Sequence, residues 1–252
     1  MVRDRIQAVV LDLFDTLVEW SPQRLPTIEW QGQTIPSTAP WFLPRLQEMM
    51  GEGFDRDTCL ATYFEVLSEI DAERERDGIE ITCLERFVRM LSRLGRWNQT
   101  EVAKLAGELT KVHMAGVRRV TSAPVAWAGA VRRIAPHFRL ALCSNFDDSE
   151  TGREILNDTG IAHLFEAVLI SADIGLRKPN PKIYQRILEM LALAPGEILF
   201  VGDGPYYDVA GPNLAGMGTV WVREKKGEFP ADVPAPDFTI ANLTELPVLL
   251  GC

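Results

Sequence analysis

A short apolar run near the start of the chain ends abruptly at a carboxylate. Val9, Val10 and Leu11 are followed directly by Asp12, and Asp15 comes three residues later. An apolar run that contains β-branched residues is typical of a buried β-strand. An aspartate at its end either caps the following turn or carries chemistry, because its side chain readily accepts hydrogen bonds from nearby backbone amides. The residues around Asp12 alone leave both interpretations open.

The same arrangement recurs in the second half of the chain. Four more polar residues come after further short apolar runs: Ser144, Lys178, Asp203 and Asp208. The carboxyl ends of strands in an open parallel sheet lie at one edge, where ligands bind. This recurrence favours one site built from all of these residues over a set of unrelated turns.

Apolar strands alternate with helical patterns from about residue 120 onward. The expected strands, with that at the start of the chain, are 6–12, 138–143, 167–171, 198–202, 218–222 and 237–240, and the expected helices lie near 125–135, 149–158, 181–192 and 206–215. Such alternation is typical of a parallel sheet covered by helices on both faces. The sequence therefore predicts an α/β fold with a doubly wound, mostly parallel, Rossmann-like sheet.

The segment between the first strand and the second departs from this alternation. Residues 27–35 alternate around Gln31-Gly32, which predicts a hairpin that is either an ordinary surface hairpin or a flap over the site. Four amphipathic helical patterns follow, two of them opened by capping-box signatures that begin at Thr82 and Asn98. We expect this segment to form a helical insertion.

With these residues in this order, the chain resembles the haloacid dehalogenase superfamily of hydrolases. The four motifs of that superfamily are matched by Asp12 with Thr16 and Leu17, by the strand ending in Ser144-Asn145, by Lys178-Pro179, and by Gly202-Asp203 with Asp208. The resemblance extends over residues 6–22 and about 120–225. Many members carry a helical cap after the first motif. The resemblance therefore implies a hydrolase core of residues 1–22 and 120–252, with a flap hairpin and helical cap in 23–119.

The chemistry expected of such a site begins with Asp12 as the nucleophile. Its carboxylate would attack an electrophilic centre and form an acyl-type intermediate that water then hydrolyses. Lys178 would hold the nucleophile and the substrate anion together by its positive charge, and Ser144 would donate a hydrogen bond to that anion. The same motifs imply substrate binding by Thr16 and Asn145.

A magnesium ion is the expected cofactor. Asp203 and Asp208 together with Asp12 would form a cluster of hard oxygen ligands of the kind that Mg²⁺ prefers, completed by water and substrate phosphate. By resemblance, the backbone carbonyl of Phe14 would be a further ligand. A small anionic molecule is therefore the expected substrate.

Phe14 departs from the usual pattern of the superfamily. Its phosphatases generally have a second aspartate two residues after the nucleophile, which acts as a general acid and then as a base. Asp15 stands one residue too far along, and a shift of one residue points a side chain elsewhere. The absence of this second aspartate should lower the rate of hydrolysis by a factor of about 10² to 10⁴ for leaving groups that need a proton. Glu73 and His113 are candidates to supply that proton, although a single helical histidine is more commonly a packing residue.

Two further interpretations stay open at this point. The superfamily's 2-haloacid dehalogenases lack the second aspartate, and the string Asp12-Leu13-Phe14 resembles theirs, but they use no metal and carry Ser and Asn in the fourth motif, where this chain has Gly202-Asp203-Gly204. Alternatively, the chain is a binding or regulatory module with little turnover. The acidic fourth motif favours the first interpretation, a Mg²⁺-dependent phosphatase for substrates with good leaving groups.

Charge and composition exclude several other classes. The 26 basic residues are outnumbered by 35 acidic ones, which gives a net charge of -9 and no electrostatic footprint for nucleic acid. No apolar run approaches membrane-spanning length, and the start of the chain makes a poor signal peptide. The four cysteines are too few for a disulfide framework and lack zinc-site spacing. We expect a cytoplasmic protein, and the sequence leaves its oligomeric state unknown.

Overall fold

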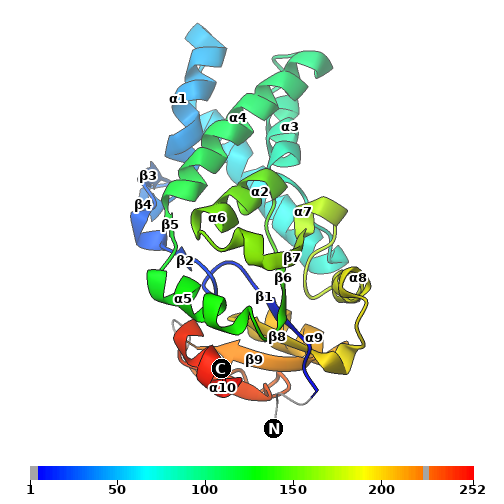
Figure 1. Cartoon of the computed structure of the whole chain (residues 1–252). Coiled ribbons are helices and arrows are strands. Elements are labelled where there is room, and N and C mark those ends of the chain that lie inside the picture. Colours follow the sequence, from blue (N-terminus) through cyan, green and yellow to red (C-terminus); the bar gives the residue numbers. More distant parts are fainter. Residues whose placement is uncertain (1–4, 224–226) are drawn as a thin grey trace. The chain divides into compact units, whose positions relative to one another are not determined.

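A six-stranded parallel sheet organises the computed structural model of the chain, which describes residues 5–223 and 227–252 (Figure 1). The strands lie in the order β10-β9-β8-β1-β6-β7. Their bounds are β1 (Ala8–Leu11), β6 (Arg139–Ser144), β7 (Phe165–Ile170), β8 (Ile198–Gly202), β9 (Gly218–Val222) and β10 (Phe238–Ile240). The predicted α/β class and the six predicted strands are confirmed.

The register of the three central strands brings their carboxyl ends to one level. Leu11 at the end of β1 pairs with Leu142 of β6 on one side and with Val201 of β8 on the other. The chain leaves β1 for β6 and β7 and then returns to β8 on the opposite side, so the strand order changes direction at β1. In open α/β sheets, ligands bind outside the strand ends at such a switch point.

Helices cover the two faces of this sheet because successive side chains of each strand point to opposite sides. Val9 and Leu11 belong to one apolar core, together with Val131 of α5. Val10 belongs to the other, together with Ile187 of α8. The helices of this part of the chain are α5 (Val125–Ile134), α6 (Ser149–Asp158), α7 (Ser171–Ile174), α8 (Pro181–Leu191), α9 (Gly211–Leu214) and α10 (Leu246–Leu249).

Two elements close in the chain to Lys178 and Asp208 differ from the sequence-based expectation. The helix expected at 206–215 is a π-helical turn, η6 (Pro205–Ala210), followed by the short α9. The short helix α7 was not predicted, and it separates β7 from Lys178. Lys178 therefore does not follow a strand directly, and packing rather than strand position sets where it lies.

Residues 21–121 form the second compact unit, whereas residues up to 20 and from 122 onward form the first. The second unit contains the hairpin β3 (Thr27–Trp30) and β4 (Gln33–Pro36) and the helices α1 (Ala39–Met50), α2 (Arg56–Asp77), α3 (Cys83–Leu94) and α4 (Gln99–Arg119). The two-residue strands β2 (Glu19–Trp20) and β5 (Thr121–Ser122) pair with each other where the chain passes between the units. The expected boundaries were 22/23 and 119/120, and the role of the second unit as a cap stays a prediction.

Local sequence signals account for the elements of the second unit. Gln31 and Gly32 both have positive φ, 49° and 77°, which is the backbone geometry of a tight two-residue hairpin turn. The side chain of Thr82 accepts a hydrogen bond from the backbone amide of Glu85 at the start of α3. The capping box at the start of α4 is complete, with reciprocal bonds between Asn98 and Glu101. The predicted hairpin and helices are therefore present.

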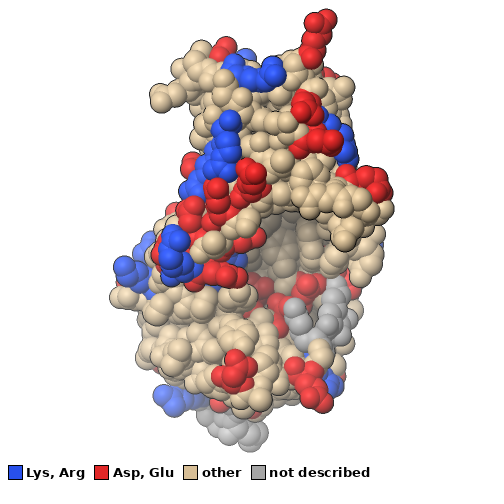
Figure 2. All heavy atoms as spheres, turned by 180° about the vertical axis from the view of Figure 1, so that it is seen from behind, with Lys and Arg blue, Asp and Glu red and all other residues tan. Residues whose placement is uncertain are grey.

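The surface carries acidic and basic side chains side by side. On the face shown in Figure 2, Lys and Arg of the described residues are mixed with Asp and Glu rather than gathered into a basic stripe. Nucleic-acid binding depends on such a stripe. Among the described residues, no helix combines the length and apolar content needed to cross a bilayer. The cytoplasmic location expected from the sequence stays a prediction.

Replacing Phe200 with Ala is expected to destabilise the first unit strongly. Phe200 lies in the central strand β8 with no exposed surface and packs edge-on against Tyr184 at 6.1 Å between ring centroids. Loss of a fully buried ring should lower the free energy of unfolding by about 3–5 kcal/mol, because transfer energy is lost and a cavity remains. Urea unfolding measures this change. The half-buried Phe238 is the control, and an equal loss in Phe238→Ala would contradict the expectation.

Candidate active site

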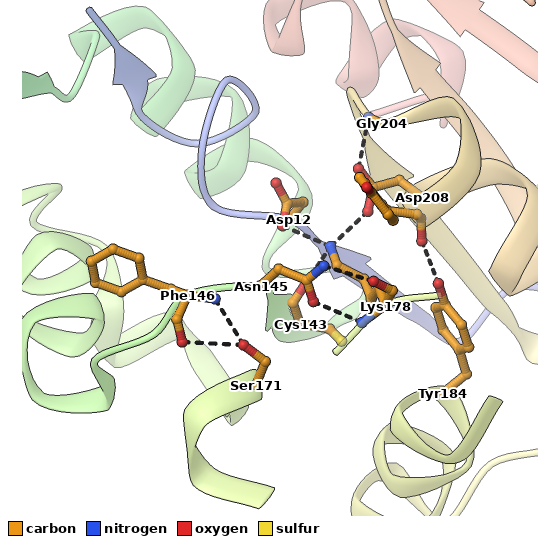
Figure 3. A network of polar contacts seen from close by, with 10 residues as sticks. Asp12, Cys143, Asn145, Phe146, Ser171, Lys178, Tyr184, Gly204 and Asp208 are labelled. Carbon is orange, nitrogen blue, oxygen red and sulfur yellow. Dashed lines mark hydrogen bonds and ion pairs between the residues drawn. The ribbon is translucent and has the colours of Figure 1, made fainter. Parts of the chain in front are cut away.

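The ammonium of Lys178 lies between the carboxylates of Asp12, directly after β1, and Asp208, in the turn η6 that follows β8. Its Nζ donates to Oδ1 of Asp12 at 2.7 Å and to Oδ1 of Asp208 at 2.6 Å (Figure 3). A third bond at 2.9 Å goes to the backbone carbonyl of Cys143 at the end of β6. All three donor sites of the ammonium are thereby used. The structure brings together Asp12, Lys178 and Asp208, as the sequence predicts.

Burial makes this arrangement electrostatically demanding. Lys178 is 1% exposed and Asp208 is 1% exposed. Burial by itself would lower the pKa of Lys178, but the carboxylates of Asp12 and Asp208 raise it well above its ordinary value. Lys178 is therefore a permanent cation, and a buried cation is stable only when it is paired.

Asp12 has an unusual protonation equilibrium. Burial is the largest cause of the upward shift of its pKa, Lys178 opposes it, and the carboxylates of Asp208 and Asp203 add to it. Together they raise the pKa of Asp12 from 3.8 to about 7 in the protein without metal. One ammonium does not compensate three carboxylates, so this site would gain from a further positive charge.

The three carboxylates fit a divalent cation. Asp12, Asp203 and Asp208 each offer an oxygen, and these oxygens lie within 4.8 Å of one another. Hard oxygen donors with a net negative charge suit Mg²⁺. The fit rests on these side chains, and the backbone carbonyl of Phe14 as a fourth ligand stays a prediction.

Glycines and backbone amides hold Asp208 in this cluster. The amide of Gly204 donates to Oδ2 of Asp208 at 2.8 Å. A Cβ on Gly202 would come within 2.4 Å of the carboxyl carbon of Asp208, so only glycine permits this approach. On the other side of the loop, the indole Nε1 of Trp221 donates to the backbone carbonyl of Asp203 at 3.0 Å.

Two buried hydroxyls have no protein partner. Thr16 and Ser144 are fully buried, and within residues 5–223 and 227–252 neither hydroxyl oxygen has a hydrogen-bond partner. Buried polar groups are almost always paired in folded proteins. Thr16 follows β1 and Ser144 ends β6, so both hydroxyls come from the carboxyl edge of the sheet, which suits an anionic ligand. Their roles in substrate binding and catalysis stay predictions.

Asn145 is used differently from the sequence-based expectation. Its Nδ2 donates to the backbone carbonyl of Lys178 at 2.9 Å, and its Oδ1 accepts from the Lys178 amide at 2.7 Å (Figure 3). Both polar atoms of the amide group therefore hold the loop that carries Lys178. The contact between Asn145 and substrate stays a prediction, whereas its positioning of Lys178 is observed.

Phe14 fills the position of the missing second aspartate with an aromatic ring. It packs against Phe146 at 5.0 Å and edge-on against Trp20 at 6.3 Å between ring centroids. Asp15 has a positive φ of 52°, and its Oδ1 accepts from the backbone amide of Trp20 at 3.1 Å. Asp15 therefore stabilises the turn, in agreement with the expectation that it does not replace the general acid.

The two proposed proton donors of the helical unit do not suit that role. Glu73 pairs with Arg89 at 2.6 Å, and the hydrogen bond from that guanidinium lowers the pKa of Glu73. His113 is buried among aromatic rings, with Phe87 at 5.6 Å and Trp41 at 6.1 Å. A carboxylate with a lowered pKa is a poor acid, and a histidine in a packed core is a structural residue.

Two residues outside the predicted set of site residues support the site. The hydroxyl of Ser171 accepts from the amide of Phe146 at 2.9 Å and bonds its carbonyl at 3.1 Å, which fixes the loop after β6 (Figure 3). Ser171 directly follows a strand, as Asp12 does, and this signal could have found it. Tyr184 donates to the backbone carbonyl of Tyr207 at 2.5 Å, and no local sequence pattern indicates that contact.

A buried carboxylate paired with a buried lysine beside an acidic loop, all on a doubly wound sheet, agrees with a match to known proteins. The model of the haloacid dehalogenase-like hydrolase family matches residues 6–216. The chain belongs to this family, as the four motifs imply.

Relatives with assigned activities include several phosphatases. The chain is 37% identical over 142 residues to a phosphoserine phosphatase of Thermus thermophilus, covering 56% of each protein. It is 43% identical over 90 residues to a glyceraldehyde 3-phosphate phosphatase of Methanopyrus kandleri, covering 34% of this chain and 39% of that protein. The chain thus spans about half or less of the length of these relatives.

Solved structures share the fold over the whole chain. A 2-haloacid dehalogenase from Pseudomonas syringae superposes with a TM-score of 0.71 at 22% identity, and the match covers 98% of both chains. A phosphatase of the family from Thermococcus onnurineus gives a TM-score of 0.60 at 22% identity, again over 98% of both chains. At 22% sequence identity, these similarities show a shared fold.

Replacing Asp12 with Asn is expected to stabilise the metal-free protein at pH 8. Because folding raises the pKa of Asp12 from 3.8 to about 7, the folded state binds more protons than the unfolded state between these values. Stability therefore falls as the pH rises through this range, and the amide does not ionise. The free energy of unfolding of Asp12→Asn should exceed that of the wild type by on the order of 1–3 kcal/mol at pH 8.

Urea unfolding in the presence of a chelator measures this effect. The gain should shrink as the pH is lowered toward 5, because Asp12 then keeps its proton in the folded state and the cost of ionising a buried carboxyl is avoided. A variant that unfolds more easily than the wild type at pH 8 would show that the carboxylate of Asp12 is stabilising in the folded protein.

Proposed function

We propose that this protein is a Mg²⁺-dependent phosphatase that acts on a small phosphorylated metabolite with a good leaving group, such as an acyl phosphate or an activated ester. The observation that carries the proposal is the cluster of Asp12, Asp203 and Asp208, two of which share the single ammonium of Lys178. A phosphate dianion would be repelled by these carboxylates without a further cation. The acidic loop therefore supports a metal-dependent reaction.

Each residue of the site has a role in this proposal. A carboxylate oxygen of Asp12 forms a bond to phosphorus while the bond to the leaving group breaks, and the leaving group departs with the electron pair. Water then attacks phosphorus while the bond from phosphorus to the Asp12 oxygen breaks, which regenerates the carboxylate, and the proton of the water leaves with the released phosphate. Lys178 keeps Asp12 in place, and the hydroxyls of Ser144 and Thr16 donate to the phosphoryl oxygens. Asp12, Asp203 and Asp208 would hold Mg²⁺, which when bound supplies charge neutralisation at the phosphoryl group.

Phe14 limits the substrates in this proposal. No carboxylate at position 14 protonates the leaving group, and none accepts the proton of the attacking water. Leaving groups that are stable as anions do not need the first of these steps. The rings of Phe146 and Trp20 against Phe14 keep this position apolar. Turnover is therefore restricted to good leaving groups.

A second candidate is a 2-haloacid dehalogenase, which Phe14 favours because a leaving halide needs no proton. In that reaction the carboxylate of Asp12 would displace the halide from carbon. Asp203 opposes this candidate, since its carboxylate would repel the carboxylate of a haloacid. A module with little turnover is the third candidate, and the retained Asp12 and Lys178 oppose it.

Phosphate release from acetyl phosphate and p-nitrophenyl phosphate is expected to need both Mg²⁺ and Asp12. The purified protein is assayed with Mg²⁺ or with chelator, alongside 2-chloropropionate as the dehalogenase substrate. Asp12→Asn is the control and should lower the rate by at least about 10³. Chloride release that is indifferent to chelator would favour the dehalogenase, and metal-dependent binding of phosphate without any product would favour a binding module.

Phe14→Asp is expected to widen the range of leaving groups. A carboxyl group at this position could protonate an alkoxide, so the rate on a simple alkyl phosphate should rise at least tenfold relative to the rate on acetyl phosphate. A fully positioned general acid contributes about 10² to 10⁴, which sets the upper end of the expected rise. The matched control is Phe14→Asn, which removes the ring equally but carries no acidic proton. An equal change in both variants would assign the effect to lost packing.

A further inference from the structure

The acidic loop that carries Asp208 has an unusual backbone. Residues Pro205–Ala210 form the π-helical turn η6, and the amide of Gly211 that closes it donates to the carbonyl of Tyr206, five residues earlier. π-Helical turns have a less common hydrogen-bond register, and they occur frequently at functional sites. In this turn, the register determines where the carboxylate of Asp208 points.

One hydrogen bond of this register cannot form. The next carbonyl in the series is that of Tyr207, and its partner five residues later is Pro212, which has no backbone N–H. The amide four residues later, that of Gly211, already donates to Tyr206. The carbonyl of Tyr207 would therefore lack a backbone donor directly beside Asp208.

Tyr184 supplies the missing donor from a different element. Its hydroxyl donates to the Tyr207 carbonyl at 2.5 Å, and Figure 3 shows its side chain directed at this turn from α8. Tyr184 is 1% exposed, so water does not replace this bond. A Cβ on Gly211 would come within 2.1 Å of the hydroxyl oxygen, which leaves only glycine compatible with the contact.

We propose that Tyr184 is a positioning residue whose hydroxyl replaces the backbone donor missing at Pro212 and thereby holds the π-helical turn that directs Asp208 toward Lys178. The carboxylate of Asp208 then reaches both the Lys178 ammonium and the amide of Gly204. The consequence for magnesium affinity rests on the proposed function, whereas the consequence for the turn does not.

A double-mutant cycle on the full-length protein tests this inference. Tyr184→Phe removes the hydroxyl without changing the ring, and Pro212→Ala restores a backbone N–H at the position from which the Tyr207 carbonyl would accept. The first readout is hydrogen exchange of the amides of Asp208 and Gly211 in the metal-free protein. Tyr184→Phe should speed this exchange roughly tenfold, and the effect should fall to about twofold or less when Pro212→Ala is also present.

The second readout is the dissociation constant of Mg²⁺, measured by calorimetry without substrate. Tyr184→Phe should weaken binding about tenfold, as expected for a residue that orients a metal ligand, and Pro212→Ala should restore most of the affinity. The matched control is Tyr63→Phe, since Tyr63 is equally buried and its hydroxyl bonds Thr38 at 3.0 Å in the other unit. This control should leave Mg²⁺ binding unchanged.

The outcomes separate the two proposals. Unchanged exchange in Tyr184→Phe, or a loss that persists undiminished in the Pro212→Ala background, would overturn the role of Tyr184. If the wild type does not bind Mg²⁺ while exchange follows the expected cycle, the metal-dependent function fails and the positioning role stands.

Discussion

The ammonium of Lys178 lies buried between the carboxylates of Asp12 and Asp208, and the positions of these three groups depend on one another. Without the ammonium, the two carboxylates would repel each other in a medium that screens charge poorly. Without them, the ammonium would be a buried unpaired charge, which proteins do not tolerate. The network therefore has to form as a unit, and Asn145 contributes by fixing the Lys178 backbone through two hydrogen bonds.

The three carboxylates of the site outnumber its one ammonium, and this deficit of positive charge connects stability with function. The pKa of Asp12 is raised to about 7 because burial and the neighbouring carboxylates outweigh Lys178. The uncompensated charges of this site lower the stability of the folded protein, as is common at sites that serve binding or catalysis. Bound Mg²⁺ would remove the deficit, and under the proposed function it would also admit a phosphate dianion beside Asp203.

The apolar position 14 gives this site a chemistry different from that of a complete acid–base pair. The ring of Phe14 packs with Phe146, whose backbone is held by the hydroxyl of Ser171. An aromatic contact of this kind fixes the loops after β1 and β6 without supplying a proton. Under the proposed function, the site therefore retains positioning and electrostatic stabilisation but has no carboxyl group at position 14 to protonate a leaving group.

The sequence by itself determined the class of fold, the hairpin, the helices of the second unit and the identity of the polar residues at the carboxyl edge of the sheet. These features follow from local rules: the two-residue period of strands, capping signatures such as that at Asn98, and turn residues such as Gly32. The approach of Lys178 to Asp12, 166 residues away, is expected from the family's motifs, whereas only the tertiary structure decided its geometry and the contact by which Tyr184 completes the turn beside Asp208. Contacts of this kind depend on strand order, register and the packing of α7 and α8, and no local pattern along the chain encodes the distance between such residues.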